Sequence, residues 1–415
     1  MKRHAAMILA VLLLLATPAW AKTTIHVAHP HSSPSSDGLQ AVADEFNISN
    51  ETVEAILDYV PYSNISQDKL QVLVAGGQAP DVVVLADLII SEWALVNGLV
   101  PLDSYIARDR VKMNQYWPSS ARVVQWRNTT WALPHTQDAR ALHFNRDHFA
   151  AVGLDDVHGP RALTELEEYN KRLTITGGDG SYERIGLIPW AAEGWFYTWG
   201  WLFGAEFYDD VAEKVTPTDP KAIRAMEWLG SYARSFPPNL IDGLNNFWGG
   251  KSSTVVHGVW GLGEWKTLFP DVNMGVLPLP PPEDEGPSTW SGIWALGISS
   301  ASKYPEAAWE FIKFATSVEG EGIYVKVAPN IMANREAAIR TMPTMRSWYG
   351  TEFTTYLDLM PYSHERPSMP AGSLYWNELA RALQRVIRQE ATPLVALEEA
   401  RFLTQSYLDE VLRAK

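Results

Sequence analysis

Aromatic and acidic side chains are concentrated in residues 189–210, PWAAEGWFYTWGWLFGAEFYDD. This stretch contains four tryptophans and two glutamates, Glu193 and Glu206. An indole ring is costly to bury completely because its N–H needs a hydrogen-bond partner. Flat apolar rings beside carboxylates suit a ligand that offers both C–H faces and hydroxyl groups, as a carbohydrate does. A single tryptophan here is more typical of a core, whereas the cluster, with Glu193 beside Trp195, indicates a binding site.

Other polar side chains stand next to predicted strands. Asp87 follows the apolar run 82–85, where it can either face a ligand or cap the next helix. Asp138 and Arg140 flank a short extended passage between two strand-like runs within residues 130–145. These three residues are therefore candidates for contacts with the same ligand.

The elements that must position these residues alternate between strands and helices. By periodicity and capping signals, the predicted strands are 24–28, 53–60 and 82–85, and the predicted helices are 37–46 (with Asp37 as N-cap), 67–74, 302–316, 376–389 and one that begins at Thr392-Pro393. The unbroken apolar run 82–85 is typical of a parallel strand that is buried on both faces. This order predicts an α/β fold with a doubly wound sheet, whose ligand site lies beyond the carboxyl ends of the strands.

Length and charge limit the classes of function. A chain of 415 residues is long enough for two lobes, each with its own core. Its net charge of −14 argues against a nucleic-acid partner, which requires a basic surface, and more weakly against an anionic small molecule. The 18 tryptophans are more than core packing requires, which again favours a binding role.

The N-terminus predicts export. Lys2 and Arg3 precede an apolar run at 5–16 and an Ala19-Trp20-Ala21 cleavage site, so residues 1–21 are expected to be a signal peptide. The sequence contains no cysteine, which excludes disulfides and a lipid-modified cysteine. We therefore expect a soluble periplasmic protein without a lipid anchor.

Several motifs, in this order, resemble those of the periplasmic solute-binding proteins of ABC transporters, in the sugar-binding branch that includes maltodextrin-binding protein. The motifs are AGGQAPDV at 75–82, NGLVPL at 97–102, the strand-like run 133–147, the run 291–300, AAWEFIKF at 307–314, ALQ at 382–384 and ALEEA at 396–400. Together they cover almost the whole chain.

The resemblance implies a two-lobe periplasmic-binding-protein fold, with doubly wound sheets in each lobe joined by a three-strand hinge. Lobe 1 would comprise residues 22–137 and 291–330, and lobe 2 residues 138–290 and 331–415. The hinge crossovers would lie near 132–140, 289–296 and 327–334. Closure of the lobes over a ligand is expected.

The resemblance also implies a set of ligand contacts. Asp138 matches a hinge carboxylate, Glu193 and Trp195 match an acid and a stacking aromatic, and Trp199 follows after a one-residue insertion. Trp260 matches a stacking tryptophan on the opposite wall, and Trp376 matches the C-terminal aromatic. Asp87, Arg140, Trp290 and Arg366 complete the expected set. Maltodextrin itself is not expected, because Leu85 and Ala380 replace a tryptophan and an arginine of its binders.

The function that follows is capture of a neutral sugar or short oligosaccharide and its delivery to the permease of an ABC importer. Two alternatives are open. One is a binding protein for glycerol phosphate, a glycerophosphodiester or a polyol. The other is a carbohydrate-active hydrolase that uses Asp138 and Glu193, or Glu264 and Asp87, as acid and base. No phosphate-binding loop is present, so ATP hydrolysis would belong to a partner subunit. We expect no metal, no cofactor and a monomer that is not an enzyme.

Overall fold

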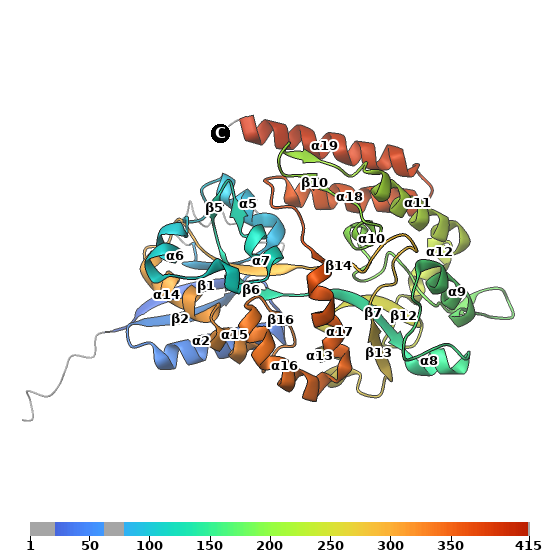
Figure 1. The fold of residues 1–415 in the computed structure, drawn as a ribbon, viewed down its shortest axis with the longest axis horizontal. Coiled ribbons are helices and arrows are strands. Elements are labelled where there is room, and N and C mark those ends of the chain that lie inside the picture. The colour runs from blue at the N-terminus through green and yellow to red at the C-terminus, as the bar shows by residue number, and fades with distance from the viewer. Residues whose placement is uncertain (1–20, 62–78, 414–415) are drawn as a thin grey trace, which may run out of the picture.

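The protein is described here by a computed structural model that covers residues 21–61 and 79–413. The expected signal peptide up to residue 20, the predicted helix 67–74 and the first part of the motif 75–82 lie outside these residues. Two sheets, each with its own helices, form the two lobes of the expected α/β fold (Figure 1).

Lobe 1 is built on a six-stranded mixed sheet in the order β16-β6-β15-β3-β1-β2. Its strands are β1 (Thr23–His29), β2 (Val53–Tyr59), β3 (Val82–Ala86), β6 (Leu133–Gln137), β15 (Ile293–Ile298) and β16 (Ile331–Met332). β1 pairs in parallel with β2 and β3, while β15 runs antiparallel to β3 and β6. The three predicted N-terminal strands are confirmed, and β3 is buried along its whole length.

The helices of lobe 1 include α2 (Ser35–Ser49), α5 (Asp87–Leu95) and α14 (Pro305–Ala315). α2 begins two residues before Asp37, which does not cap the helix: its carboxylate accepts a hydrogen bond from Ser33 Oγ at 2.6 Å. α14 begins at Pro305, because proline's fixed φ suits the first helical position.

Lobe 2 contains a smaller, three-stranded sheet in the order β12-β7-β13. Its strands are β7 (Arg140–Asn145), β12 (Thr254–Gly258) and β13 (Met274–Leu277), and β7 runs antiparallel to both neighbours. The doubly wound pattern expected for each lobe therefore does not extend to this sheet. The βαβα order from which it was predicted was that of residues 24–85, whose described strands belong to the sheet of lobe 1.

Helices α10 (Phe196–Leu202), α11 (Pro220–Ser235), α18 (Gly372–Ile387) and α19 (Pro393–Arg413) pack together as the helical part of lobe 2. Thr392 Oγ1 accepts a hydrogen bond from Val395 N at 3.4 Å, as expected for an N-cap before Pro393.

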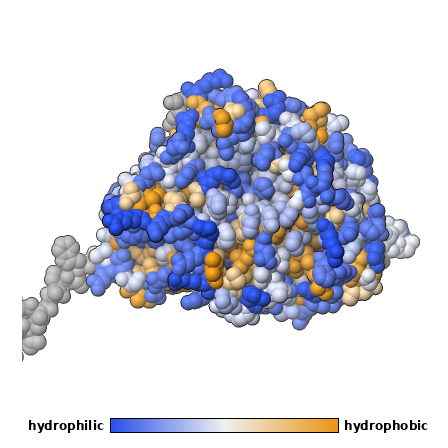
Figure 2. All heavy atoms as spheres, viewed as in Figure 1, coloured by the Kyte–Doolittle hydropathy of each residue, from blue (hydrophilic) through white to orange (hydrophobic). Residues whose placement is uncertain are grey.

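On the face of the molecule in Figure 2, hydrophobic residues form small groups among hydrophilic ones.

The chain passes between the two sheets at three places. It leaves β6 for β7 at Asp138, returns from lobe 2 through β14 (Thr289–Trp290) into β15, and leaves β16 towards α16 (Arg335–Tyr349). These positions fall within the expected crossovers. The lobe boundaries after residues 137, 290 and 330 stay a prediction.

Candidate functional site

Three indole rings and two guanidinium groups form one continuous row. The guanidinium carbon of Arg140 lies 3.7 Å from the centre of the Trp290 ring and 5.1 Å from that of Trp260. The guanidinium carbon of Arg366 lies 5.2 Å from the centre of the Trp290 ring and 5.1 Å from that of Trp376. Cation–π attraction favours this alternation of cations and rings. We call these five residues the tryptophan–arginine row.

The row is assembled where segments of the two lobes meet. Arg140 opens β7 directly after the first crossover, and Trp290 ends β14 directly before the second. β14 pairs in parallel with β17 (Ser363–His364), which brings Arg366 close to Trp290. Trp260 precedes α13 (Gly261–Leu268), and Trp376 lies in the first turns of α18. Sequence positions as far apart as 140 and 376 therefore contribute to one site.

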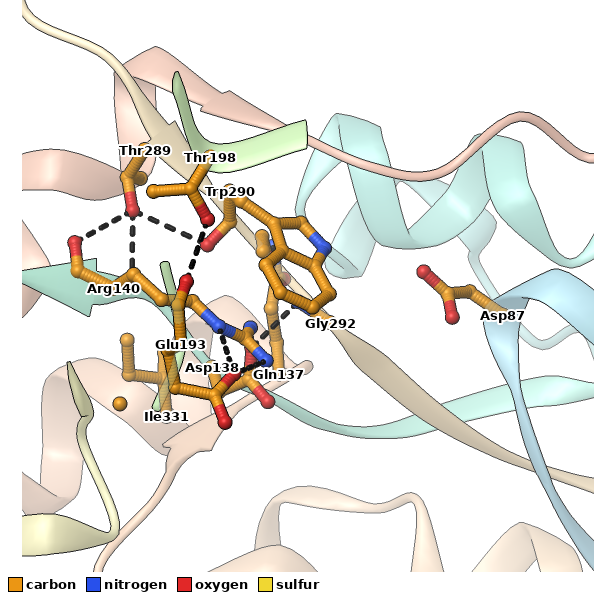
Figure 3. A network of polar contacts seen from close by, with 12 residues as sticks. Asp87, Gln137, Asp138, Arg140, Glu193, Thr198, Thr289, Trp290, Gly292 and Ile331 are labelled. Atoms are coloured by element: carbon orange, nitrogen blue, oxygen red, sulfur yellow. Dashed lines mark hydrogen bonds and ion pairs between the residues drawn. The ribbon is translucent and has the colours of Figure 1, made fainter. Parts of the chain in front are cut away.

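Arg140 is held by two carboxylates (Figure 3). Its Nε and Nη2 donate to Glu193 Oε2 at 3.2 and 3.1 Å, and its Nη1 donates to Asp138 Oδ1. Burial raises the pKa of Asp138 to about 6, although the charge of Arg140 opposes this shift. The guanidinium is therefore fixed on its edge by acids and on its faces by rings.

The second arginine of the row is paired across the lobes. Arg366 Nε donates to Asp87 Oδ2 at 3.2 Å, and its Nη2 donates to Asp87 Oδ1. Asp87 is the first residue of α5 and is fully buried. Asp87 Oδ1 also accepts a hydrogen bond from the backbone N–H of Leu88 at 2.9 Å. The sequence predicted that Asp87 either faces a ligand or caps the following helix. It does not cap α5, and its carboxylate forms an ion pair with Arg366 at the site.

The members of the site differ in their access to solvent. Trp195 is 37% exposed, and its ring centre lies 4.8 Å from that of Trp376. Trp260 and Trp376 are half-buried, whereas Trp290 is only 3% exposed. The side chain of Glu193 is 22% exposed and that of Asp138 is 8% exposed. Trp195, Trp260, Trp376 and Glu193 are consequently the groups that an incoming molecule can reach first.

The charges of the site nearly cancel. Asp87, Asp138 and Glu193 bring three carboxylates, and Arg140 and Arg366 bring two guanidinium groups, each of which is hydrogen-bonded to at least one of these acids. A phosphate group would have to compete with these carboxylates for the same N–H donors. The arrangement therefore favours a ligand without negative charge.

Trp199 lies in the core of lobe 2 and does not join the site. It is fully buried, its Nε1 donates to Pro189 O at 2.7 Å, and its ring lies 4.7 Å from that of Trp228. All seven residues of α10 are buried, so most rings of the 189–210 cluster are core. The indole N–H that suggested a ligand is satisfied by a backbone carbonyl instead.

Three residues that the sequence did not single out hold the crossovers in place. Thr289 Oγ1 accepts from Arg140 N at 2.9 Å, and Gly292 N donates to Asp138 Oδ1 at 2.5 Å. Gln137 is fully buried and donates to Ser291 Oγ at 2.9 Å. Each of these contacts joins residues about 150 positions apart in the chain. The only sequence signal for them is that the residues lie near the predicted crossovers.

Comparison with known proteins identifies the family. A model of the bacterial extracellular solute-binding proteins matches residues 32–322, which is more than half of the chain. The chain belongs to this family.

Relatives of this solute-binding protein cover most of its length. It is 22% identical to the galactooligosaccharide-binding protein of Bacillus subtilis over 374 residues, which are 88% of this chain and 84% of the relative. It is also similar to a binding protein solved with mannobiose bound, with a TM-score of 0.82, 22% identity and coverage of 92% of this chain and all of the other. The GacH receptor of Streptomyces glaucescens, solved unliganded and with acarbose, has a TM-score of 0.78 at 20% identity and covers 94% and 99% of the two chains. These structures show that the two-lobe fold is shared.

The described part of this solute-binding protein has neither a cluster of metal-binding side chains nor a helix that could span a membrane. Residues 21–61 and 79–413 contain no group of three or more His, Asp or Glu side chains that could hold a metal ion. Within the same residues, no helix is both long and apolar enough to cross a bilayer.

Proposed function

We propose that this protein is the substrate-binding component of an ABC importer, which captures a neutral sugar or short oligosaccharide at the tryptophan–arginine row. The observation that carries this proposal is the combination of accessible indole rings with arginines that are already neutralised by acids. Trp195, Trp260 and Trp376 would stack on sugar rings, and Glu193 and Asp138 would accept hydrogen bonds from hydroxyl groups. Trp290, which is buried, would position the guanidinium groups of Arg140 and Arg366 by contact with its ring.

The relatives favour the same class of ligand. They include proteins named for a galactooligosaccharide or solved with mannobiose or acarbose. In their two-lobe fold a ligand is held by closure of the lobes. The protein would then act outside the cytoplasm as a monomer and release its ligand to the membrane permease, while the ATPase subunit acts only indirectly.

The two alternatives find less support in the site. A glycerol phosphate or phosphodiester would need free cationic donors, and both arginines of the row are paired with carboxylates. A hydrolase would need one acid to donate a proton and the other to act on the opposite side of the bond. Asp138 and Glu193 instead converge on the same guanidinium, so we propose that the protein is not an enzyme.

A thermal-shift screen followed by calorimetry tests the proposal. The panel would contain mannobiose, galactose-containing disaccharides, maltotriose, glycerol 3-phosphate and a glycerophosphodiester. A ligand at a hundred times its Kd adds about 2.7 kcal/mol to the free energy of unfolding, which such a screen detects readily. Stabilisation by the phosphates alone, or release of shortened sugars during incubation, would overturn the proposal.

A further inference from the structure

A cavity lined by segments of both lobes shares only Arg366 with the tryptophan–arginine row. Its volume is about 440 Å³, within the range of small-molecule sites. Lobe 1 lines it with the end of α7 (Pro118–Val123) and with β4 (Gln125–Trp126) and the turn that follows. Lobe 2 lines it with the hairpin of β10 (Tyr208–Asp209) and with residues 364–368.

Four acids and three arginines line this cavity. Glu206, Asp210, Glu213 and Glu365 line it, as do Arg122, Arg127 and Arg366. Arg366 is already paired with Asp87, which lies outside the lining. Burial raises the pKa of Tyr208, another lining residue, and the nearby Glu213, Asp210 and Asp209 raise it further. Once the pairs Arg122–Glu365 and Arg366–Asp87 are set aside, three acids and one arginine remain in the lining.

One carboxylate of the lining has an oxygen without a donor. The Glu365 side chain is only 6% exposed, and its Oε1 accepts from Arg122 Nε at 2.5 Å. Its Oε2 is buried and has no hydrogen-bond partner among the described residues. An unsatisfied buried acceptor is unfavourable, and the penalty is larger for a charged group. A ligand with an N–H donor would remove this penalty.

Both tryptophans of the cavity lining already carry other groups on their rings. Both faces of Trp201 are covered, by Tyr197 at 4.8 Å and by His364 at 5.6 Å between ring centres. Trp126 carries the guanidinium of Arg127 at 4.8 Å from its ring centre. The ring of Trp201 is therefore covered, and one face of Trp126 is occupied.

We propose that this cavity is a second binding site, for a small organic cation with N–H donors such as a primary amine or diamine. Glu365 Oε2 accepts a hydrogen bond from the ammonium group, and the rim acids Glu206, Asp210 and Glu213 provide the negative field that attracts it. The inference goes beyond the proposed sugar site, because it concerns different residues and a different class of ligand.

Calorimetric titration of the full-length protein with 1,4-diaminobutane tests the site, with 1,4-butanediol as the neutral probe of equal length. We expect the diamine to bind and the diol not to bind. Glu365→Gln should weaken diamine binding at least tenfold, because a hydrogen bond to a charged acceptor is replaced by one to a neutral amide. The matched control is Glu168→Gln, an exposed acid outside the cavity whose ion pair is with Lys171, and it should change nothing.

Circular dichroism tests whether the Glu365→Gln variant folds. If it does not, the double variant Glu206→Gln with Glu213→Gln takes its place, since both side chains lie on the rim, and it should also weaken diamine binding. No binding of the diamine at about 10 mM, where even weak sites are occupied, would overturn the proposal. Equal binding by wild type and the cavity variants, or tighter binding of the diol than of the diamine, would overturn it as well.

Discussion

Glu92 in α5 of lobe 1 accepts two hydrogen bonds from Ser373 at the start of α18 in lobe 2. Ser373 N donates to Oε1 at 2.6 Å and Ser373 Oγ donates to Oε2 at 2.9 Å. Burial raises the pKa of Glu92 from 4.5 to about 7, although these two hydrogen bonds oppose the shift. The folded protein therefore holds a proton on this carboxyl between about pH 4.5 and 7, where the unfolded chain has lost it.

The consequence is a loss of stability as the pH rises through this window. The raised pKa stabilises the folded state fully below about pH 4.5, and this contribution is lost as the pH approaches 7. Glu92→Gln removes the titration, so the stability of the variant relative to wild type should increase between pH 4.5 and 7 by at most about 3 kcal/mol. Urea unfolding of both proteins at several pH values measures this, and parallel curves would contradict the assignment.

Truncation of the accessible tryptophans should weaken ligand binding without unfolding the protein. Trp260→Ala and Trp376→Ala each remove a ring of the row, and aromatic truncations at binding sites often cost about 2 kcal/mol or more. We expect Kd for the sugar identified in the screen to rise about ten- to a hundredfold, measured by calorimetry.

Trp309 provides the matched control for these variants. It is fully buried in α14, and its Nε1 donates to Asp109 Oδ2 at 2.7 Å. Trp309→Ala should lower the free energy of unfolding by about 3–5 kcal/mol and leave the affinity of the folded fraction nearly unchanged. If Trp260→Ala and Trp376→Ala bind like wild type, the row is not the ligand site.

Because Gly292 has no side chain, the first crossover at Asp138 and the second crossover, between β14 and β15, can approach each other closely. A Cβ at this position would lie 3.1 Å from both carboxylate oxygens of Asp138 and 3.2 Å from Arg140 Nη1. Gly292→Ala should therefore displace this acid pair, lower stability by about 1–3 kcal/mol and weaken sugar binding. The control is Gly286→Ala, whose Cβ would meet nothing within 4 Å. Similar behaviour of the two variants in thermal unfolding and calorimetry would show that the contact is unimportant.

A bound sugar should draw the lobes together. The three crossovers are short, and a few connecting residues can absorb a closing motion. Solution scattering should then show a smaller radius of gyration at saturating ligand than without it. An unchanged scattering curve in a sample whose binding is confirmed by calorimetry would count against closure.

Export should remove the first 21 residues. The basic start, the apolar run and the Ala19-Trp20-Ala21 site predict a mature protein that begins at Lys22. Intact-mass measurement of the protein from the periplasmic fraction checks this. An uncleaved or lipid-modified N-terminus would refute the prediction.

The best-predicted elements were those that a few consecutive residues indicate. The apolar run after Asp81 gave β3, and Pro393 after Thr392 marked the start of α19, because burial on both faces and capping are each visible in a few residues. The crossovers near Asp138 and Trp290 were also found, through the family motifs. Nine of the ten expected site residues lie in or next to the row.

Trp199 and the network around Gly292 show where such prediction fails. α10 is buried on every side, so its sequence has no polar face that would separate core rings from accessible ones. The contacts of Gly292 with Asp138 and of Arg366 with Asp87 join residues 154 and 279 positions apart. No spacing rule reaches that far, and the antiparallel sheet of lobe 2 was missed for the same reason.

The clamping of Arg140 has a consequence for the thermodynamics of recognition. A long side chain that is free in solution loses about 0.5–1.5 kcal/mol of conformational entropy when a ligand immobilises it. Contacts within the protein itself hold Arg140 between Trp290, Trp260, Asp138 and Glu193. The Arg140 side chain therefore loses its conformational entropy when the protein folds. Because this loss is not repeated on binding, more of the free energy of the sugar contacts contributes to affinity.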